Sequence, residues 1–568
     1  MKRIFITTIF LLSLAFAAGA QDMYYAHTLS RNNYYGSARS VALGNAVTAL
    51  GGDLGSVTFN PAGGAVNQYW QFTVTPGLLF SAVNTSYAAD GVNYGAPNKE
   101  GHTKFSIPNI GLMMVLDSED SDWLRWTSFG VVANSTNNFL SYSTGRGVNS
   151  NTSFLGSLAA GAWGLKPSEM PRNLYAGYAA NQFGEYGAEG SLVYAGSNER
   201  VNDKETYSYM PGALDQVSVM NSFGSKTDLA WNLAFNVEDC FYFGFNLGTP
   251  TIRYRFQEVF SEAAQQPSAF PVVFVSQQKD GSTLKETTNY VNSTNGYKLN
   301  SSGVGIYGQL GFIYLPTKNL RVGASFQTPT LYSISEEWRY TASSSYERIK
   351  FDGNAKSSLG EATYTIRTPY VVDAGVAWTV PGLGLLSVDY EMMDYSVIKY
   401  SDEDSYDSFV EDSWSGTNNI NRKFGGVSHS VRAGLEVKPI PILALRAGYS
   451  LVTSGEKYWL DDTGAMVTAE TVRFKGNTDI FAQNLVSSHY FKDLTHAFSI
   501  GAGYSSPGSF FADLAVRLTN YPTVEYAPYY YGAYDAKDNA GRSLGVAAPV
   551  ESIDRSLVDV LLTFGWRF

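Results

Sequence analysis

One glycine motif has the residue types and spacing of a nucleotide-binding site. Gly303-x-Gly305-x-x-Gly308 matches a dinucleotide fingerprint, in which glycines let the backbone approach a pyrophosphate held at a helix N-terminus. Here the pattern of a strand continues from Ile306 to Tyr314, so no helix follows that could hold the pyrophosphate. We interpret the motif as glycine packing within a β-sheet.

A second motif has the spacing of a serine nucleophile. Gly541-x-Ser543-x-Gly545 matches the nucleophile elbow, but it lies in a long polar loop without the strand and helix that position such a serine. No H-E-x-x-H occurs, and a single cysteine, Cys240, leaves no multi-thiolate metal site. A catalytic triad assembled from residues far apart in the chain is the weaker interpretation. We therefore expect no catalytic residues, no metal and no cofactor.

Composition narrows the class of protein. The chain has 568 residues, of which 44% are hydrophobic, 14% aromatic and 16% charged, and its net charge is −11. This content of aromatic and apolar residues predicts a folded chain, since disordered chains are poor in both. The acidic surplus, with no basic stripe to offset it, argues against a nucleic-acid partner.

The first twenty residues predict export. Lys2 and Arg3 precede a mostly apolar run over 4–18, and small residues at 18–20 fit a cleavage site, so we interpret residues 1–20 as a signal peptide. A membrane anchor is less favoured because the run is short. Beyond residue 20 no stretch of about 18 apolar residues appears, so no spanning helix is expected.

Alternation of apolar with small or polar residues recurs along the rest of the chain. It indicates β-strands with one apolar face, as at Leu229, Trp231, Leu233, Phe235 and Val237. Short turns separate some strands, and long polar stretches near 140–225, 260–298, 400–425, 455–492 and 521–554 separate others. Short turns at one end and long loops at the other are typical of a bacterial outer-membrane barrel. A secreted soluble β-sandwich or propeller is the alternative.

The C-terminal strand strengthens the barrel prediction. Apolar side chains alternate to the terminal Phe568, as a strand between lipid and a lumen requires. Fifteen strand candidates can be marked, whereas single-chain bacterial barrels usually have an even number, so we expect one of them to be a loop hairpin. The candidates are 70–83, 103–116, 126–136, 228–238, 240–257, 301–315, 319–332, 335–350, 362–380, 384–399, 427–438, 442–453, 495–505, 508–520 and 555–568.

The segment 21–68 differs from the strands that follow it. It is rich in small residues, and Ser37 to Leu50 has the spacing of a short helix that Gly51 and Gly52 would end. A block too short to fold alone, placed before a barrel, is most simply a hatch that plugs the lumen. The alternative is a periplasmic tail. We expect residues 69–568 to form the barrel.

At this point the residues resemble a known family. The hatch of the FadL/TodX outer-membrane transporters of hydrophobic compounds is similar to segment 36–46 followed by Asn60-Pro61-Ala62. Ile107-Pro108-Asn109 resembles that family's inward-kinked early strand. Further similar segments are 314–317 with 320–326, and 445–449. The resemblance is closer in the strands than in the long loops.

The resemblance implies a transmembrane antiparallel β-barrel of about 14 strands with an N-terminal hatch. It implies hatch residues Gly44, Asn60, Pro61 and Ala62, and a lateral opening at Pro108 and Asn109. A hydrophobic ligand, by default a long-chain fatty acid, would bind among the extracellular loops, move to a lumen pocket and leave sideways into the bilayer. Proline at 108 fits such an opening because it has no amide hydrogen for a ladder bond. A strand end at Pro108 and a simple turn at Asn60-Pro61 are the alternative interpretations.

Two other functions stay open. One is a haem-binding outer-membrane receptor, in which His489, His496 or tyrosines would ligate iron. The other is a non-transporting barrel that docks secreted proteins, like the family's shuttle member in type IX secretion. For the leading interpretation we expect a monomer in the outer membrane of a Gram-negative bacterium, in contact with lipid and lipopolysaccharide. We also expect the barrel-assembly machinery to recognise Phe568.

Overall fold

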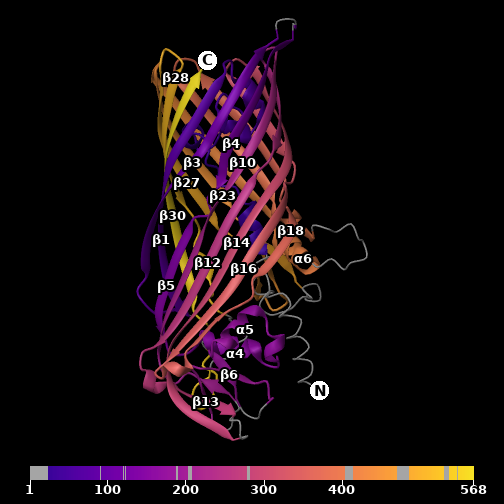
Figure 1. The fold of residues 1–568 in the computed structure, drawn as a ribbon. Coiled ribbons are helices and arrows are strands. Elements are labelled where there is room, and N and C mark those ends of the chain that lie inside the picture. Colours follow the sequence, from indigo (N-terminus) through magenta and orange to yellow (C-terminus); the bar gives the residue numbers. More distant parts are fainter. Residues whose placement is uncertain are drawn as a thin grey trace.

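The strands form one closed antiparallel barrel. The computed structural model describes residues 23–89, 91–118, 121, 123–186, 190–202, 207–277, 282–402, 414–469, 485–529, 537–545 and 548–568. The first spanning strand, β1 (Gln71–Ala89), pairs with the last, β30 (Val550–Arg567), from Gln71–Arg567 to Ala88–Val550. This pairing leaves no open edge, so the backbone can cross lipid with its hydrogen bonds satisfied. The predicted fold class is confirmed (Figure 1).

Fourteen spanning strands make up the described wall. Five of them are interrupted and carry two labels. In order they are β1; β3 (Asn98–Asp117); β4 (Leu124–Asn137) with β5 (Ser141–Asn149); β10 (Leu214–Val237); β11 (Phe241–Gly248) with β12 (Thr251–Ala264); β14 (Thr283–Thr317); β15 (Leu320–Gln327) with β16 (Leu331–Tyr346); β19 (Val371–Val380) with β18 (Gly360–Arg367); β20 (Gly384–Asp394) with β21 (Lys399–Asp402); β22 (Val427–Ile440); β23 (Leu443–Thr453); β27 (Leu494–Ser505); β28 (Phe510–Asn520); and β30.

The sequence predicts an odd number of strands, but the reason is not the loop hairpin that we expected. The candidates 319–332 and 335–350 are not two strands or a loop hairpin. They correspond to β15 and β16, which both pair with β14 and form two halves of one spanning strand. The interruption lies at Thr328-Pro329-Thr330, where a proline cannot donate to the ladder. The sequence also underestimated β10 and β14, whose polar outer halves extend beyond the apolar pattern.

The outer surface carries an apolar belt. Successive side chains of each strand point alternately to lipid and to the lumen, and the outward ones are large and exposed although they are apolar. The C-terminal strand follows the predicted alternation, with Leu562 outward and Asp559 and Thr563 buried inside. Belt residues include Trp231, Leu233, Phe243, Phe245, Leu310, Phe312, Leu386, Val388, Val431, Leu435, Leu514 and Leu518. Tyr69, Trp70 and Trp378 are exposed where the strands end, as an interfacial girdle requires.

Long loops gather at one end of the barrel. The elements α4, α5, β6 and β13 lie at the end away from the C-terminus, where Figure 1 shows them beyond the strands. Short turns close the other end, for example between β10 and β11. Among the long-loop elements, α4 (Phe154–Ala162) buries Leu155, Leu158, Ala159 and Ala162 in an apolar cluster.

Further elements complete the described loops. They are β2 (Val92–Asn93), α4 (Phe154–Ala162), η3 (Pro167–Glu169), α5 (Arg172–Ala179), β6 (Phe183–Glu185), β7 (Tyr194–Gly196), β8 (Arg200–Val201), β9 (Ser208–Tyr209), η4 (Pro267–Ala269), β13 (Pro271–Gln277), η5 (Ile349–Phe351), β17 (Gly353–Lys356), η6 (Tyr395–Val397), α6 (Ser415–Phe424), β24 (Lys457–Leu460), β25 (Met466–Val467), β26 (Ser487–Tyr490) and β29 (Val524–Tyr526).

The N-terminal segment lies inside the barrel. It comprises α2 (Met23–Ser30), α3 (Ala38–Ala42), η1 (Leu54–Thr58) and η2 (Pro61–Val66). Walls on several sides enclose it, since η2 contacts β4, β10, β11 and β14 while α3 contacts β23, β27, β28 and β30. The signal peptide predicted at 1–20 lies outside the described residues.

The predicted helix from Ser37 to Leu50 was wrong in length. Only Ala38–Ala42 is helical, because the chain turns at Gly44 and Asn45, which both have positive φ. The eight-residue helix α2 was not predicted. None of the described helices is both long and apolar enough to cross a membrane.

An arginine placed in the apolar belt should destabilise the barrel, because its charge would face hydrocarbon. For Leu233→Arg we expect a loss of about 2–4 kcal/mol in the free energy of unfolding from lipid vesicles. Thr363→Arg, on the outer face of β18 and outside the belt, is the control and should change it little. Urea unfolding in large unilamellar vesicles measures both. Equal losses would contradict the placement of the belt.

Candidate functional site: a plugged lumen and an unpaired seam

The predicted Asn-Pro-Ala segment locks the plug to the wall. Asn60 caps η2, accepting from the Ala62 N–H at 3.0 Å, and Pro61 occupies the first position of that helix, where no donor is needed. The Asn60 Nδ2 donates to the carbonyls of Thr48 (2.8 Å) and Phe312 (2.9 Å). One buried amide therefore joins two plug segments to strand β14.

Glycines in the wall let the plug backbone touch it. A Cβ added to Gly311 would lie 2.1 Å from the Asn60 Oδ1, and one on Gly448 would lie 2.0 Å from the Gly44 amide nitrogen. Gly44 itself has φ +64°, and a Cβ there would lie 2.7 Å from the Tyr449 nitrogen. We name the glycines of the barrel strands that face the plug the wall glycines. Besides Gly311 and Gly448 they are Gly111, Gly244, Gly323, Gly375, Gly434 and Gly501.

The four predicted hatch residues thus dock at two places. Asn60, Pro61 and Ala62 meet β10, β11 and β14, whereas Gly44 meets β22 and β23. On the latter side the wall also carries buried ion pairs, since Arg446 contacts Glu436 at 2.7 Å and Asp513, and Arg39 of α3 approaches Glu436 at 3.4 Å. The lumen next to the short turns is therefore filled by the plug and its polar partners.

The lumen next to the long loops holds an apolar chamber instead. Inward side chains of five spanning strands meet there with Phe139 from the break between β4 and β5, and α2 inserts Tyr25, Ala26 and Leu29 among them. The Tyr25 hydroxyl donates to Ser301 at 2.6 Å. We define the apolar chamber by its wall residues Phe139, Ile252, Tyr254, Leu299, Tyr332, Ile334, Trp338, Tyr364, Ile366, Val371, Met393, Tyr395, Ile398 and Tyr400.

His27 of α2 is held in the same surroundings. Its ring lies 4.5 Å from the ring of Tyr395 and its Nδ1 is 3.8 Å from Glu456. Burial, with a smaller effect of Arg31, lowers the pKa of His27 to about 3, so the ring is neutral at ordinary pH. A neutral ring suits a helix inserted into an apolar chamber.

A buried lysine closes the inner end of the chamber. The Lys226 Nζ donates to the carbonyls of Leu29 and Ser30, both at 3.0 Å, and to the Asn32 Oδ1 at 2.9 Å. The ammonium thus caps the C-terminus of α2, a favourable position for a cation. Close by, Tyr307 donates to Asp228 at 2.5 Å.

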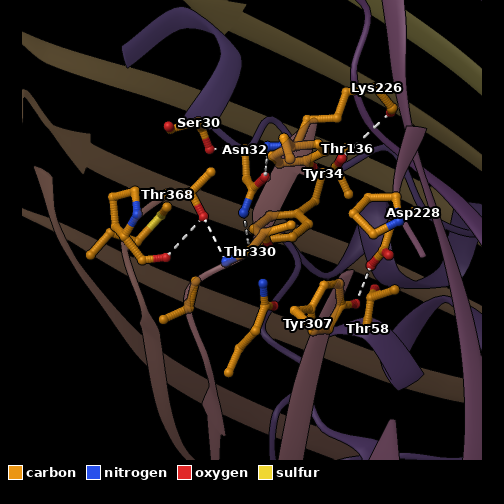
Figure 2. A pocket seen from close by; sticks show the side chains of 16 residues that line it. Ser30, Asn32, Tyr34, Thr58, Thr136, Lys226, Asp228, Tyr307, Thr330 and Thr368 are labelled. Carbon is orange, nitrogen blue, oxygen red and sulfur yellow. Dashed lines mark hydrogen bonds between the residues drawn. The ribbon is translucent and has the colours of Figure 1, made fainter. Parts of the chain in front are cut away.

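Figure 2 shows a cavity between these groups. Plug residues line one side and residues of β4, β10, β14 and β16 the other. The cavity measures only about 20 Å³, the scale of one bound water, so in this state the chamber is occupied by the protein itself. Its wall includes Tyr332, Val371 and Met393, which also belong to the apolar chamber.

The backbone pairing between the second spanning strand, β3, and the third, β4 with β5, is interrupted. Strand β3 pairs with β4 only from Asn109 to Asp117, and β5 pairs with β10. Among the described residues no backbone pairing joins 98–108 of β3 to β5. The chain breaks at 138–140, where Phe139 has φ +50°, and β5 bends into the lumen, since a Cβ on Gly145 would lie 2.7 Å from the Glu551 side chain. We call this boundary the unpaired seam.

Few contacts bridge the unpaired seam, and most of them come from side chains. The rings of His102 and Tyr142 lie 4.1 Å apart, and the Lys104 Nζ donates to the Gly224 carbonyl at 2.7 Å. At the loop end, the Val148 N–H donates to the Tyr94 carbonyl at 2.8 Å. The seam is therefore closed here by a few contacts that could part without breaking the barrel.

Pro108 and Asn109 stand at the inner end of the seam. Pro108 is the first residue of β3 beyond its pairing with β4, and β3 runs through it without ending. Asn109 is fully buried and donates to the Asn134 Oδ1 at 2.7 Å. The sharp break lies opposite, at 138–140, between the predicted strand 126–136 and the long polar stretch predicted near 140–225. The role of Pro108 and Asn109 in a lateral opening stays a prediction.

The histidines named for the haem alternative are held separately. His489 lies on β26, where Ser487 contacts its Nε2 at 2.9 Å, whereas His496 lies on β27 and contacts the Tyr449 hydroxyl at 2.9 Å. Within the described ranges, no three His, Cys, Asp or Glu side chains are grouped to hold a metal ion.

Sequence reasoning missed Lys226, α2 and the chamber. The chamber residues come from strands far apart in the chain, and their inward alternation resembles that of any half-buried strand. The sequence gives a weak signal for Lys226. This lysine lies between Ser225 and Thr227, in a stretch where residues that point into the lumen should be polar. Nothing local indicated that its partners would be carbonyls of the plug.

Comparison with known proteins adds only structural matches. No protein-family model matches the chain, and no curated protein matches it. The chain is similar to FadL/TodX barrels. It matches the toluene transporter TodX of Pseudomonas putida (13% identity, 95% of this chain and 99% of that one, TM-score 0.44). It also matches a FadL homologue of Pseudomonas aeruginosa (12%, 94% and 99%, 0.46) and the toluene transporter TbuX of Ralstonia pickettii (12%, 95% and 99%, 0.42).

Removal of the Asn60 amide should loosen the plug. For Asn60→Ala we expect a loss of about 1–3 kcal/mol in plug docking, because two buried carbonyls lose their donor. Hydrogen exchange of the amides in 46–66 measures it, and they should exchange faster while the barrel amides do not. Asn67→Ala is the matched control, since the Asn67 Nδ2 has no partner among the described residues. Equal effects of the two changes would contradict the locking role of Asn60.

Proposed function

We propose that this protein carries hydrophobic small molecules across the outer membrane. A ligand caught by the long loops would enter the apolar chamber as α2 withdraws, and would leave through the unpaired seam into the bilayer. Long-chain fatty acids are the proposed ligands. The apolar chamber inside the barrel carries this proposal, because the lumen of a water-filled porin is polar.

The contacts of α2 support the entry step. In this state Tyr25 and Leu29 fill the chamber, so a ligand tail of similar volume would regain the same apolar burial once α2 withdrew. The plug elements deeper in the lumen hold their places through Asn60 and the wall glycines, independently of α2. Withdrawal of one helix therefore need not open a path to the periplasm.

Lys226 supports a carboxylate-headed ligand. Its ammonium is bound by two carbonyls and an amide oxygen of the plug, and it has no carboxylate within ion-pair distance among the described residues. Loss of the α2 carbonyls would leave a buried cation, which is costly unless an anion replaces them. The carboxylate of a fatty acid lying in the apolar chamber would satisfy it.

The seam supports a lateral exit. Release into water would expose the ligand tail, whereas the seam opens toward lipid beside the outward Phe105 and Ile107. The backbone groups of 98–108 in β3 do not pair with β5, so separation of β3 from β5 breaks few hydrogen bonds. Among the described residues, no observation favours the haem or protein-docking alternatives.

Loss of the Lys226 charge should weaken binding of acids and spare alcohols. For Lys226→Met we expect roughly tenfold to hundredfold weaker binding of dodecanoate, the range of one charge-assisted hydrogen bond, with binding of 1-dodecanol equal or tighter. Displacement of a fluorescent fatty acid from the detergent-purified protein measures both. Lys104→Met, which removes a lysine bonded to a wall carbonyl outside the chamber, is the control and should leave both unchanged. Equal weakening for acid and alcohol would contradict the role of Lys226.

A cross-link across the seam should stop release but not capture. We expect His102→Cys with Tyr142→Cys, in a Cys240→Ser background and bridged by a short thiol cross-linker, to bind fatty acid normally and to lose uptake into cells. The same protein before cross-linking should transport. A matched pair on two strands that remain paired, Ser335→Cys with Thr363→Cys, controls for the reagent. Unchanged uptake after complete cross-linking would remove the lateral path from the proposal.

A further inference from the structure

Four basic side chains form a patch on the outer wall. They are Arg253 and Arg255 of β12, Lys298 of β14 and Arg339 of β16, all exposed. Their neighbours in sequence, Ile252, Tyr254, Leu299 and Trp338, point inward into the apolar chamber, so alternation turns the four charges outward. We name these four residues the outer basic patch.

The strand register makes the patch continuous. Lys298 lies directly opposite Arg339, and Arg255 lies opposite Asn300, two residues from Lys298. Arg253 is two residues from Arg255 on the same face. Side chains directly opposite have Cβ atoms about 5 Å apart and diagonal ones about 7–8 Å, so four cations share one small area.

The protein offsets the charges of the patch only in part. Within the described part of the chain none of the four forms an ion pair, although the guanidinium of Arg255 lies over the ring of Phe223 at 5.7 Å. The nearest carboxylates by register are Glu337, opposite Asn300, and Glu361, opposite Glu337. Like charges directly opposite each other destabilise a sheet, as Lys298 and Arg339 do here, unless an anion lies between them.

The patch adjoins the apolar belt. Arg253 is opposite Ser302, and the next outward residues along β14 toward the membrane are Val304 and Ile306, both more than half exposed. Leu331 of β16 lies opposite Ile306 and extends this apolar surface. Along a strand, two residues span about 7 Å, so the patch begins one step from the hydrocarbon region on the long-loop side.

We propose that the outer basic patch binds the phosphorylated headgroup of an outer-leaflet glycolipid, lipid A, whose acyl chains lie along the apolar belt below. Arginine forks match phosphate oxygens in pairs, and one phosphate between Lys298 and Arg339 would relieve their repulsion. Free phosphate would meet the charges but not the belt, so the lipid is the occupant. This proposal does not depend on transport, because the patch faces lipid and the chamber faces the lumen.

Titration of the detergent-purified full chain with diphosphoryl lipid A, read by native mass spectrometry, tests the proposal. We expect Arg253→Gln, Arg255→Gln, Lys298→Gln and Arg339→Gln together to weaken binding at least tenfold. The matched control removes four positive charges elsewhere on the surface and should bind lipid A as the native chain does. Its substitutions, all at exposed residues, are Lys99→Gln, Lys166→Gln, Lys318→Gln and Arg542→Gln.

Two further measurements complete the test. Fatty-acid binding and heat-modified gel migration should be unchanged in the patch variant, which shows an intact barrel. Inorganic phosphate at millimolar concentration should not displace lipid A from the native chain. Equal lipid A binding by patch variant and control variant would overturn the proposal, and so would displacement by free phosphate alone.

Discussion

Pairing of β1 with β30 closes the sheet, and the other features of the molecule depend on that closure. In lipid each unpaired N–H or C=O is costly, so a sheet in the membrane has no stable open edge. A closed sheet of fourteen strands encloses more space than its own inward side chains fill. The chain fills it with its N-terminal segment, and the wall glycines allow backbone to lie against backbone there. Plug and wall consequently hold each other through groups such as Asn60 that no single strand could satisfy.

The lumen is divided into two environments along its length. Toward the short turns, polar and charged wall residues bind the plug, as Glu436 with Arg39 of α3 illustrates. Toward the long loops, aromatic and aliphatic wall residues surround α2. Buried polar partners specify one geometry because an unpaired group is expensive, whereas apolar contacts are non-directional and exchange readily. In the proposed transport, this difference would keep the deep plug in place while α2 leaves the chamber.

At the unpaired seam the backbone pairing between two neighbouring spanning strands is interrupted. The interruption persists because Pro108 has no donor for β4, because the chain turns at Phe139, and because β5 pairs with β10 inside the barrel. The Lys104 ammonium donates to the Gly224 carbonyl, and the His102 and Tyr142 rings contact each other across the boundary. The described wall thus contains a boundary that few contacts bridge, most of them from side chains.

The sequence by itself determined the barrel, because alternation of residue types, turn spacing and a terminal aromatic are local signals that lipid and lumen impose strand by strand. A hatch over 21–68 and the roles of Asn60, Pro61 and Ala62 in it are predictions from composition and from the family resemblance. The sequence predicted fifteen strands because an interruption at Thr328-Pro329-Thr330 looks like a turn until both halves are seen to pair with β14. It could not place the chamber, Lys226 or the break at 138–140. Those depend on which strands become neighbours and on where the plug ends in the lumen, and only the tertiary structure decides that, because burial and pairing there are long-range properties.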